Sequence, residues 1–173
     1  MIKNYVSTVL LALMLVGCDS ESGGPFIPPA EDDQVPTGDA VALAALQGSW
    51  DSVCIPFGES ASGIRRLTFQ DDTMLEAVDE FANGVCSGSP SDTFNSESSF
   101  TLGASRISGD GLAVNDFDAV FTVSGDGLVG TEYFDILRVD DNQLFFGTVD
   151  GNFATDANDR PQMLNFDEVY TKQ

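Results

Sequence analysis

Acidic side chains are the most numerous groups in this sequence that could take part in chemistry. Two carboxyl groups on either side of a glycosidic bond can hydrolyse it, one as general acid and the other as base or nucleophile. The closely spaced acids are Asp71-Asp72, Asp116 with Asp118, Asp140-Asp141 and Asp167-Glu168. Such pairs arise by chance in a chain with 28 Asp and Glu residues. Nearly all of them fall at predicted turns or on predicted solvent faces, so we expect no catalytic pair and no enzyme.

Histidine is absent, and 7 Lys and Arg residues oppose the 28 acids, which gives a formal net charge of −21. Without histidine, Ser-His-Asp and Cys-His mechanisms and His-ligated metal sites are excluded. Binding to nucleic acid requires clustered Lys and Arg, so we expect no nucleic-acid partner. A hydrophobic content of 42% is nevertheless enough for the core of one domain.

Calcium is the metal that this composition suits best, because Asp-rich loops supply the six to eight oxygen ligands that Ca²⁺ takes. The most suggestive run extends from Asp150-Gly151-Asn152 to Asp156-Ala157-Asn158-Asp159. It does not have the spacing of an EF-hand loop. We therefore expect solvated turn residues here, and predict neither a metal nor a cofactor.

The N-terminus has the pattern of an export signal. Lys3 precedes an apolar run from about Val9 to Val16, shorter than the roughly 20 residues of a membrane-spanning helix. The run ends in Leu15-Val16-Gly17-Cys18, which resembles the lipobox of bacterial lipoproteins. The resemblance implies removal of residues 1–17 and a membrane anchor of more than one acyl chain on Cys18. The acidic Asp19 resembles an inner-membrane retention signal, but that rule varies between bacterial groups, so inner and outer membrane both stay open.

Residues 19–40 are dominated by Pro, Gly, Ser and acids and show no apolar period. Such a composition predicts an extended tether, which with Cys18 covers 18–40. The folded domain is then predicted to cover 41–173.

Two cysteines, Cys54 and Cys86, remain once Cys18 is assigned to the lipid. An even number of cysteines in an exported chain predicts a disulfide. Closing a loop of about 33 residues would stabilise the fold by roughly 3–4 kcal/mol. The alternative is a reactive or metal-binding pair, which neither a basic residue nor a histidine nearby in sequence supports.

The domain is predicted to be all-β apart from one or two helical turns at 41–46. Alternating apolar residues and turn residues predict about eight short strands. These are 50–55, 64–69, 74–81, 94–102, 113–123, 129–139, 144–149 and 165–171. Sequential hairpins favour a meander, and closing a meander removes its exposed edges. We therefore predict an antiparallel up-and-down barrel, with a β-sandwich as the alternative.

Alternation also predicts which side chains share a face. The predicted sets are Phe94, Phe100 and Leu102; Phe117, Ala119, Phe121 and Val123; and Leu164, Phe166 and Tyr170. The chain holds 13 phenylalanines, which would either fill a barrel core or line a cavity for an apolar ligand. The number of strands does not decide between these outcomes, because small eight-stranded barrels do both.

The run Leu46-Gln47-Gly48-Ser49-Trp50 resembles the Gly-x-Trp opening of lipocalin-like barrels. The resemblance implies that Trp50 packs across the closed end beside an arginine from a late strand, for which Arg138 and Arg160 are the candidates. It also implies a cavity for a small apolar ligand. The candidate cavity residues are Trp50, Phe69, Phe100, Phe117, Phe121, Phe134 and Phe146.

Two functions follow as expectations for a domain held in the periplasm or at the cell surface by its lipid. The first is binding of a small apolar ligand, which requires a cavity of several hundred Å³. The second is docking of an envelope protein by a barrel with a filled interior and an exposed apolar patch.

Overall fold

The computed structural model describes residues 38–125, 127–148 and 154–173. The predicted signal peptide, Cys18 and most of the predicted tether lie outside these residues. The described chain begins with helix α1 (Gly38–Leu46), and apart from one short 3₁₀-helix its further regular structure consists of β-strands.

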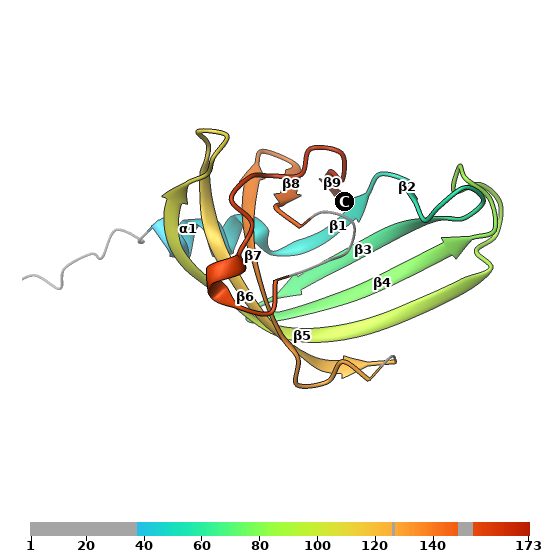
Figure 1. Cartoon of the computed structure of the whole chain (residues 1–173), viewed down its shortest axis with the longest axis horizontal. Helices are drawn as coiled ribbons and strands as arrows, with labels where there is room; N and C mark the ends of the chain where they lie inside the picture. The colour runs from blue at the N-terminus through green and yellow to red at the C-terminus, as the bar shows by residue number, and fades with distance from the viewer. Residues whose placement is uncertain (1–37, 126, 149–153) are drawn as a thin grey trace, which may run out of the picture. The chain divides into compact units, whose positions relative to one another are not determined.

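Nine strands form one antiparallel sheet in the described part of the chain (Figure 1). They are β1 (Gly48–Ser52), β2 (Ile55–Pro56), β3 (Ser62–Gln70), β4 (Thr73–Phe81), β5 (Asp92–Ile107), β6 (Ala113–Ser124), β7 (Glu132–Asp140), β8 (Gln143–Phe146) and β9 (Tyr170–Lys172). Strands β3 to β9 are paired in chain order, and β1 closes the sheet by pairing with both β3 and β9. The result is the predicted up-and-down barrel of eight strands, with β2 added beside β3.

Two of the hairpin turns were predicted from acidic pairs. Asp71 and Asp141 adopt positive φ angles of 54° and 52°, in the left-handed region that Asp and Asn tolerate better than most residues. Asp71 joins β3 to β4, and Asp141 joins β7 to β8. Both aspartates therefore belong to turns. The side chain of Gln47, between α1 and β1, accepts a hydrogen bond from the Asp71 backbone N–H over 2.7 Å.

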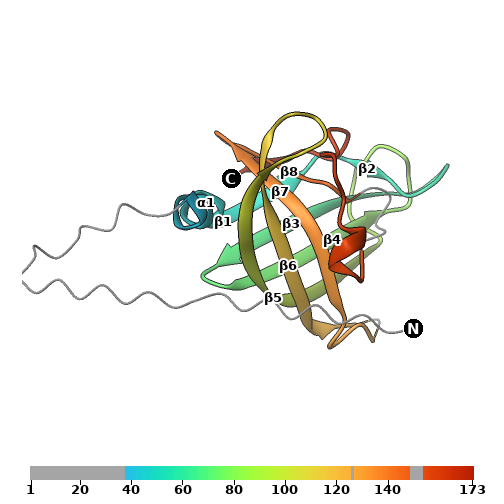
Figure 2. The ribbon, with the colours of Figure 1, turned by 60° about the vertical axis from the view of Figure 1, so that its left-hand side comes forward.

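Strand β5 is the longest element and curves around the barrel (Figure 2). Its pairing with β6 shifts register between Glu97 and Ser98 and again between Leu102 and Ser105. Such bulges bend a strand and change which side chains face inward. The first shift reverses the predicted alternation, so Val123 is 55% exposed although Phe121, two residues earlier, is buried.

The segment before β9 crosses the outside of the barrel, so only the end of the predicted strand 165–171 forms, as part of β9. This segment contains the short 3₁₀-helix η1 (Ala157–Asp159), which lies near β6 and β7 in Figure 1. Leu164 packs in a second apolar cluster with residues on the outer faces of β6, β7 and β8: Val114, Ile136 and Phe145. Phe166 packs against Phe145 and is 51% exposed, whereas Tyr170 is buried inside the barrel. These three residues therefore do not share one face.

Arg160 attaches this outer segment to the barrel wall. Its Nη1 donates to the backbone carbonyl oxygens of Phe117 and Asp135 over 2.9 and 2.6 Å, and its Nη2 pairs with the Asp118 carboxylate. The guanidinium carbon also lies 5.4 Å from the centroid of the Phe134 ring. Arg160 and Asp118 therefore hold the outer segment against the barrel. Phe134, which lies beside Arg160, is on the outer surface of the barrel.

Candidate functional site: the barrel cavity

One end of the barrel is closed by helix α1 and a buried tryptophan. Trp50 is fully buried, and its indole Nε1 donates to the Leu46 carbonyl oxygen over 2.7 Å. Lys172 Nζ lies 4.9 Å from the centroid of the indole ring. The cation beside Trp50 is therefore Lys172, not Arg138 or Arg160, because β9 pairs Lys172 directly with Trp50 in the sheet.

A layer of aromatic side chains fills the interior next to the closed end. Phe100 packs against Phe69 and Phe117 with ring centroids 5.4 Å apart in each pair. Phe117 also packs edge-on against Phe146 at 5.5 Å. Four of the predicted cavity residues, Trp50, Phe69, Phe100 and Phe117, therefore belong to the packed core. They form the floor of the space above them.

A cavity of about 500 Å³ occupies the interior between this floor and the other end of the barrel. Its aromatic lining comes from β5 to β9 and consists of Phe94, Phe121, Tyr133, Phe146 and Tyr170. Two of these, Phe121 and Phe146, were predicted cavity residues. Phe134, the remaining candidate, lies outside the barrel against Arg160.

Charged side chains line the cavity wall just above the aromatic floor. Arg65 Nη1 forms an ion pair with Glu168 Oε1 over 3.2 Å, and Arg65 Nε lies 3.9 Å from Glu76 Oε1. The Tyr170 hydroxyl donates to the same Glu168 oxygen over 2.6 Å, and Ser96 Oγ donates to Glu76 over 3.1 Å. These side chains are mostly buried, so their interactions are screened less than those of surface ion pairs.

Asp135 contributes a further carboxylate from β7. It is 3% exposed, and its Oδ1 accepts hydrogen bonds from the Ile136 and Gly147 backbone N–H groups over 2.7 and 3.0 Å. Oδ2 accepts a hydrogen bond from the Thr148 hydroxyl. Burial raises the pKa of Asp135 to about 6, because these hydrogen bonds offset only part of the cost of desolvating the charge. Burial likewise raises the pKa of Tyr133 and Tyr170, which stay protonated.

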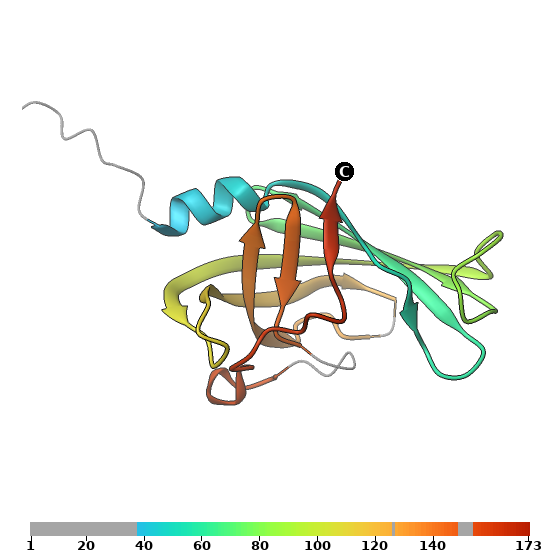
Figure 3. The ribbon, with the colours of Figure 1, turned by 90° about the horizontal axis from the view of Figure 1, so that it is seen from above.

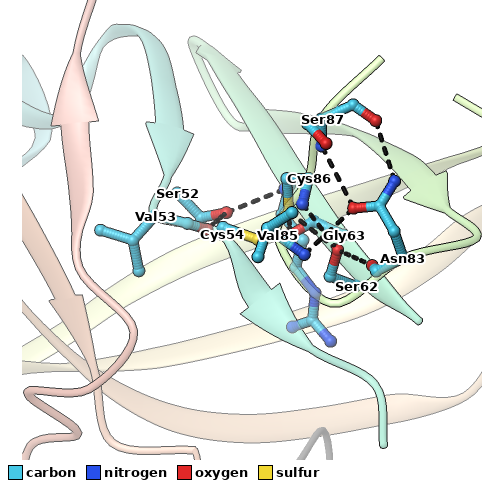
Figure 4. Close-up of a disulfide and its surroundings, with 10 residues drawn as sticks. Ser52, Val53, Cys54, Ser62, Gly63, Asn83, Val85, Cys86 and Ser87 are labelled. Atoms are coloured by element: carbon cyan, nitrogen blue, oxygen red, sulfur yellow. Dashed lines mark hydrogen bonds between the residues drawn. A yellow bond between two sulfur atoms is a disulfide. The ribbon is translucent and has the colours of Figure 1, made fainter. Parts of the chain in front are cut away.

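The rim at the open end of the barrel contains the predicted disulfide (Figure 4). Cys54 and Cys86 are bonded, with their Cα atoms 5.8 Å apart. The bond ties the link between β1 and β2 to the loop between β4 and β5. Ser62 reinforces it: Ser62 Oγ donates to the Asn83 carbonyl oxygen over 2.6 Å and accepts from the Cys86 backbone N–H over 2.9 Å. Covalent and hydrogen-bonded connections therefore join three segments of the rim.

The charged half of this cavity was not predicted. A usable signal existed, because Arg65 has the same strand parity as Leu67 and Phe69, and Glu76 has the same parity as Met74. Alternation therefore places these charges on the inward face. A charged side chain on a predicted inward face indicates a polar feature of the interior.

The suggestive acidic run gives no metal site in the described residues. Asp156 accepts a hydrogen bond from the Asn158 backbone N–H and caps η1, while residues 150–153 lie outside the described chain. In the described ranges, no three acidic or cysteine side chains gather as a metal-binding group. No helix among the described residues is both long enough and apolar enough to cross a bilayer.

Comparison of the chain with protein-family models, characterised proteins and solved structures yields no match.

Proposed function

We propose that this chain is a bacterial cell-envelope lipoprotein whose barrel binds a small, largely apolar ligand. The single observation that carries the binding function is the cavity of about 500 Å³. Ligand pockets in proteins typically measure roughly 300–1,000 Å³ and combine apolar walls with a few placed polar groups. The aromatic rings and the charged groups of this cavity supply that combination. A docking module would need no such space inside the barrel.

The proposed location rests on the sequence. The lipobox-like run ending at Cys18 supports cleavage before that residue and attachment of the anchor to it. The tether would then hold the domain away from the membrane. Its acids would repel anionic headgroups, since like charges raise the free energy of close approach. The disulfide between Cys54 and Cys86 supports an oxidising compartment, where such bonds persist.

Ligand binding is tested by filling the cavity from its wall. Val78 lines the cavity on β4, and Leu75 lies on the same strand with 42% of its surface exposed. We expect native mass spectrometry to detect a bound small molecule on the purified full chain and on Leu75→Trp, but not on Val78→Trp. A bound molecule retained equally by both variants would contradict binding inside the barrel.

The anchor is tested separately by intact mass. The purified mature chain should begin at Cys18 and carry the mass of its acyl chains, and Cys18→Ala should carry none. A natural chain that keeps residues 1–17, or that lacks acyl mass, would refute the lipoprotein assignment without affecting ligand binding.

A further inference from the structure

The charged groups in the cavity wall narrow the class of ligand. We infer that the cavity selects a small aromatic or aliphatic amine, which carries a positive charge, over a carboxylate of the same shape. This inference rests on the proposed ligand-binding function and goes beyond it by assigning the sign of the ligand's charge. Three observations support it: the net negative charge of the cavity wall, the ion pairs that Arg65 already makes, and the aromatic lining.

The charge balance of the described cavity lining is negative. Three carboxylates, Glu76, Asp135 and Glu168, oppose a single guanidinium, that of Arg65. They surround the cavity instead of gathering at one point. Strand β7, which carries Asp135, lies opposite β3, which carries Arg65, in the closed order of eight strands. A ligand in the space therefore has acidic groups on more than one side.

Arg65 is already engaged and makes a poor receptor for an anionic ligand. Glu168 and Glu76 lie 3.2 and 3.9 Å from its guanidinium nitrogens. A ligand carboxylate that displaced one of them would leave that carboxylate buried without its partner. Arg65 Nε has no hydrogen-bond partner among the described residues, but a ligand carboxylate that accepted from it would lie beside the like-charged Glu76 Oε1, which is 3.9 Å from the same nitrogen. Removing a partner from a buried charge is costly, whereas a cation entering the same space gains attraction from every carboxylate around it.

Aromatic rings give a cation a second favourable contact. Phe121 and Tyr133 lie with ring centroids 5.1 Å apart, and Phe146 and Tyr170 lie 5.8 Å apart at nearly right angles. All four rings line the cavity. Ring faces attract ammonium groups, and this attraction strengthens when the cation is removed from water. The same rings also accept the apolar body of the ligand, so one site suits both parts of an amphipathic amine.

Asp135 adds a reason why the cavity favours a cation. Its carboxylate is nearly completely buried, and no basic residue of the described lining reaches it. At neutral pH the ionised Asp135 carboxylate is therefore destabilised by its removal from water. A cation bound in the cavity would offset part of that destabilisation.

The inference is tested with three probes of one shape: naphthylmethylamine, naphthalenemethanol and naphthoate. Isothermal titration uses the full mature chain in phosphatidylcholine nanodiscs near pH 8, where the amine is charged and the carboxylates are ionised. Empty nanodiscs provide the reference for partition into lipid. We expect the amine to bind about tenfold more tightly than the alcohol, as for a contact with one desolvated charge, and the naphthoate to bind most weakly.

A matched pair of variants separates the cavity charge from the overall charge. Glu76→Gln should lower the affinity for the amine about fivefold to tenfold and leave the alcohol within about twofold, because it removes one carboxylate of the wall. Glu132→Gln makes the same change in net charge at an exposed position of β7 and should change neither affinity. Thermal unfolding of both variants establishes that each remains folded under the titration conditions.

The outcomes distinguish failure of the amine preference from failure of ligand binding itself. Equal or tighter binding of the alcohol or the naphthoate would overturn the amine preference while leaving ligand binding in place. Equal loss of amine affinity in Glu76→Gln and Glu132→Gln would also overturn it, since the preference would then reflect the net charge of the protein. Failure of all three probes to bind would overturn the proposed function together with the inference.

Discussion

The two ends of this barrel are built from the same strands but have opposite characters. At the closed end, inward positions carry Trp50, Phe69 and Phe117, which are all buried and packed in contact with other apolar side chains. Towards the open end, inward positions of the same sheet carry Arg65 and Asp135 around an unfilled space. The closed end therefore stabilises the fold, and the open end has room for charged groups that a packed core would exclude.

The change of character occurs within single strands. On β3 the inward residues run from Phe69 through Leu67 to Arg65, and on β7 they run from Leu137 to Asp135. Figure 3 shows β7, β8 and β9 side by side on one wall of the barrel. A packed zone and a cavity can therefore follow one another along the barrel axis, because strands such as β3 and β7 cross both zones. Three predictions test whether the two zones are as different as their residues indicate.

The largest effect is expected from truncating the packed floor. Phe117→Ala should lower the free energy of unfolding by about 3–5 kcal/mol, because Phe117 is fully buried among other rings. Phe94→Ala, at the cavity mouth where Phe94 is 53% exposed, should cost less than about 1 kcal/mol. Urea denaturation of both variants measures the difference. Similar losses in the two variants would mean that the cavity wall stabilises the fold as strongly as the floor.

The next effect concerns the rim. The double substitution Cys54→Ser and Cys86→Ser should lower the free energy of unfolding by roughly 3–4 kcal/mol, because the bond closes a long loop in the unfolded chain. Hydrogen exchange should accelerate in the loops of the open rim and much less in β1 beside the closed end. Uniform acceleration throughout the barrel would show that the two ends open together as one cooperative unit.

The smallest effect concerns the buried carboxyl of Asp135 and depends on pH. The folded carboxyl keeps its proton up to about pH 6, whereas the ordinary value is 3.8. Between these values the unfolded chain loses this proton before the folded chain does, so the contribution of Asp135 to stability falls as pH rises. Asp135→Asn should therefore gain stability relative to the natural chain, by up to about 3 kcal/mol between about pH 4 and pH 7.5.

Urea unfolding at both pH values measures this gain, with Glu132→Gln as the control at an exposed position of the same strand. The control should show no comparable dependence on pH. A stability difference between Asp135→Asn and the natural chain that stays constant across the range would mean that Asp135 titrates alike in the folded and unfolded chain.

Much of the fold could be predicted because its signals are local. Alternation on β6 correctly placed Phe117, Ala119 and Phe121 on one face, and acidic turn residues marked the ends of β3 and β7. Local signals failed where a distant contact decides the conformation. A register shift against β5 turned Val123 outward, and the predicted last strand was shortened because Leu164 packs on the outside of the barrel.

The candidate site was predicted only in part for a related reason. Phe121 and Phe146 line the cavity as expected, whereas Phe69, Phe100 and Phe117 lie below it. Strand parity distinguishes inside from outside but carries no information on depth along the barrel axis. Depth depends on how far each strand is staggered against its neighbours, which is a property of the closed sheet.

The sequence by itself determined an all-β domain, its up-and-down order of hairpins and the pairing of its two domain cysteines, because alternation, turn chemistry and cysteine number act over short spans or by simple exclusion. The tertiary structure alone decided where the interior is filled and where it is hollow. It also brought Arg65 to Glu168 across 103 positions of the chain. Such long-range contacts depend on closure of the barrel. Only the closed sheet sets which inward side chains lie at the same depth along the barrel axis and how much space remains between them.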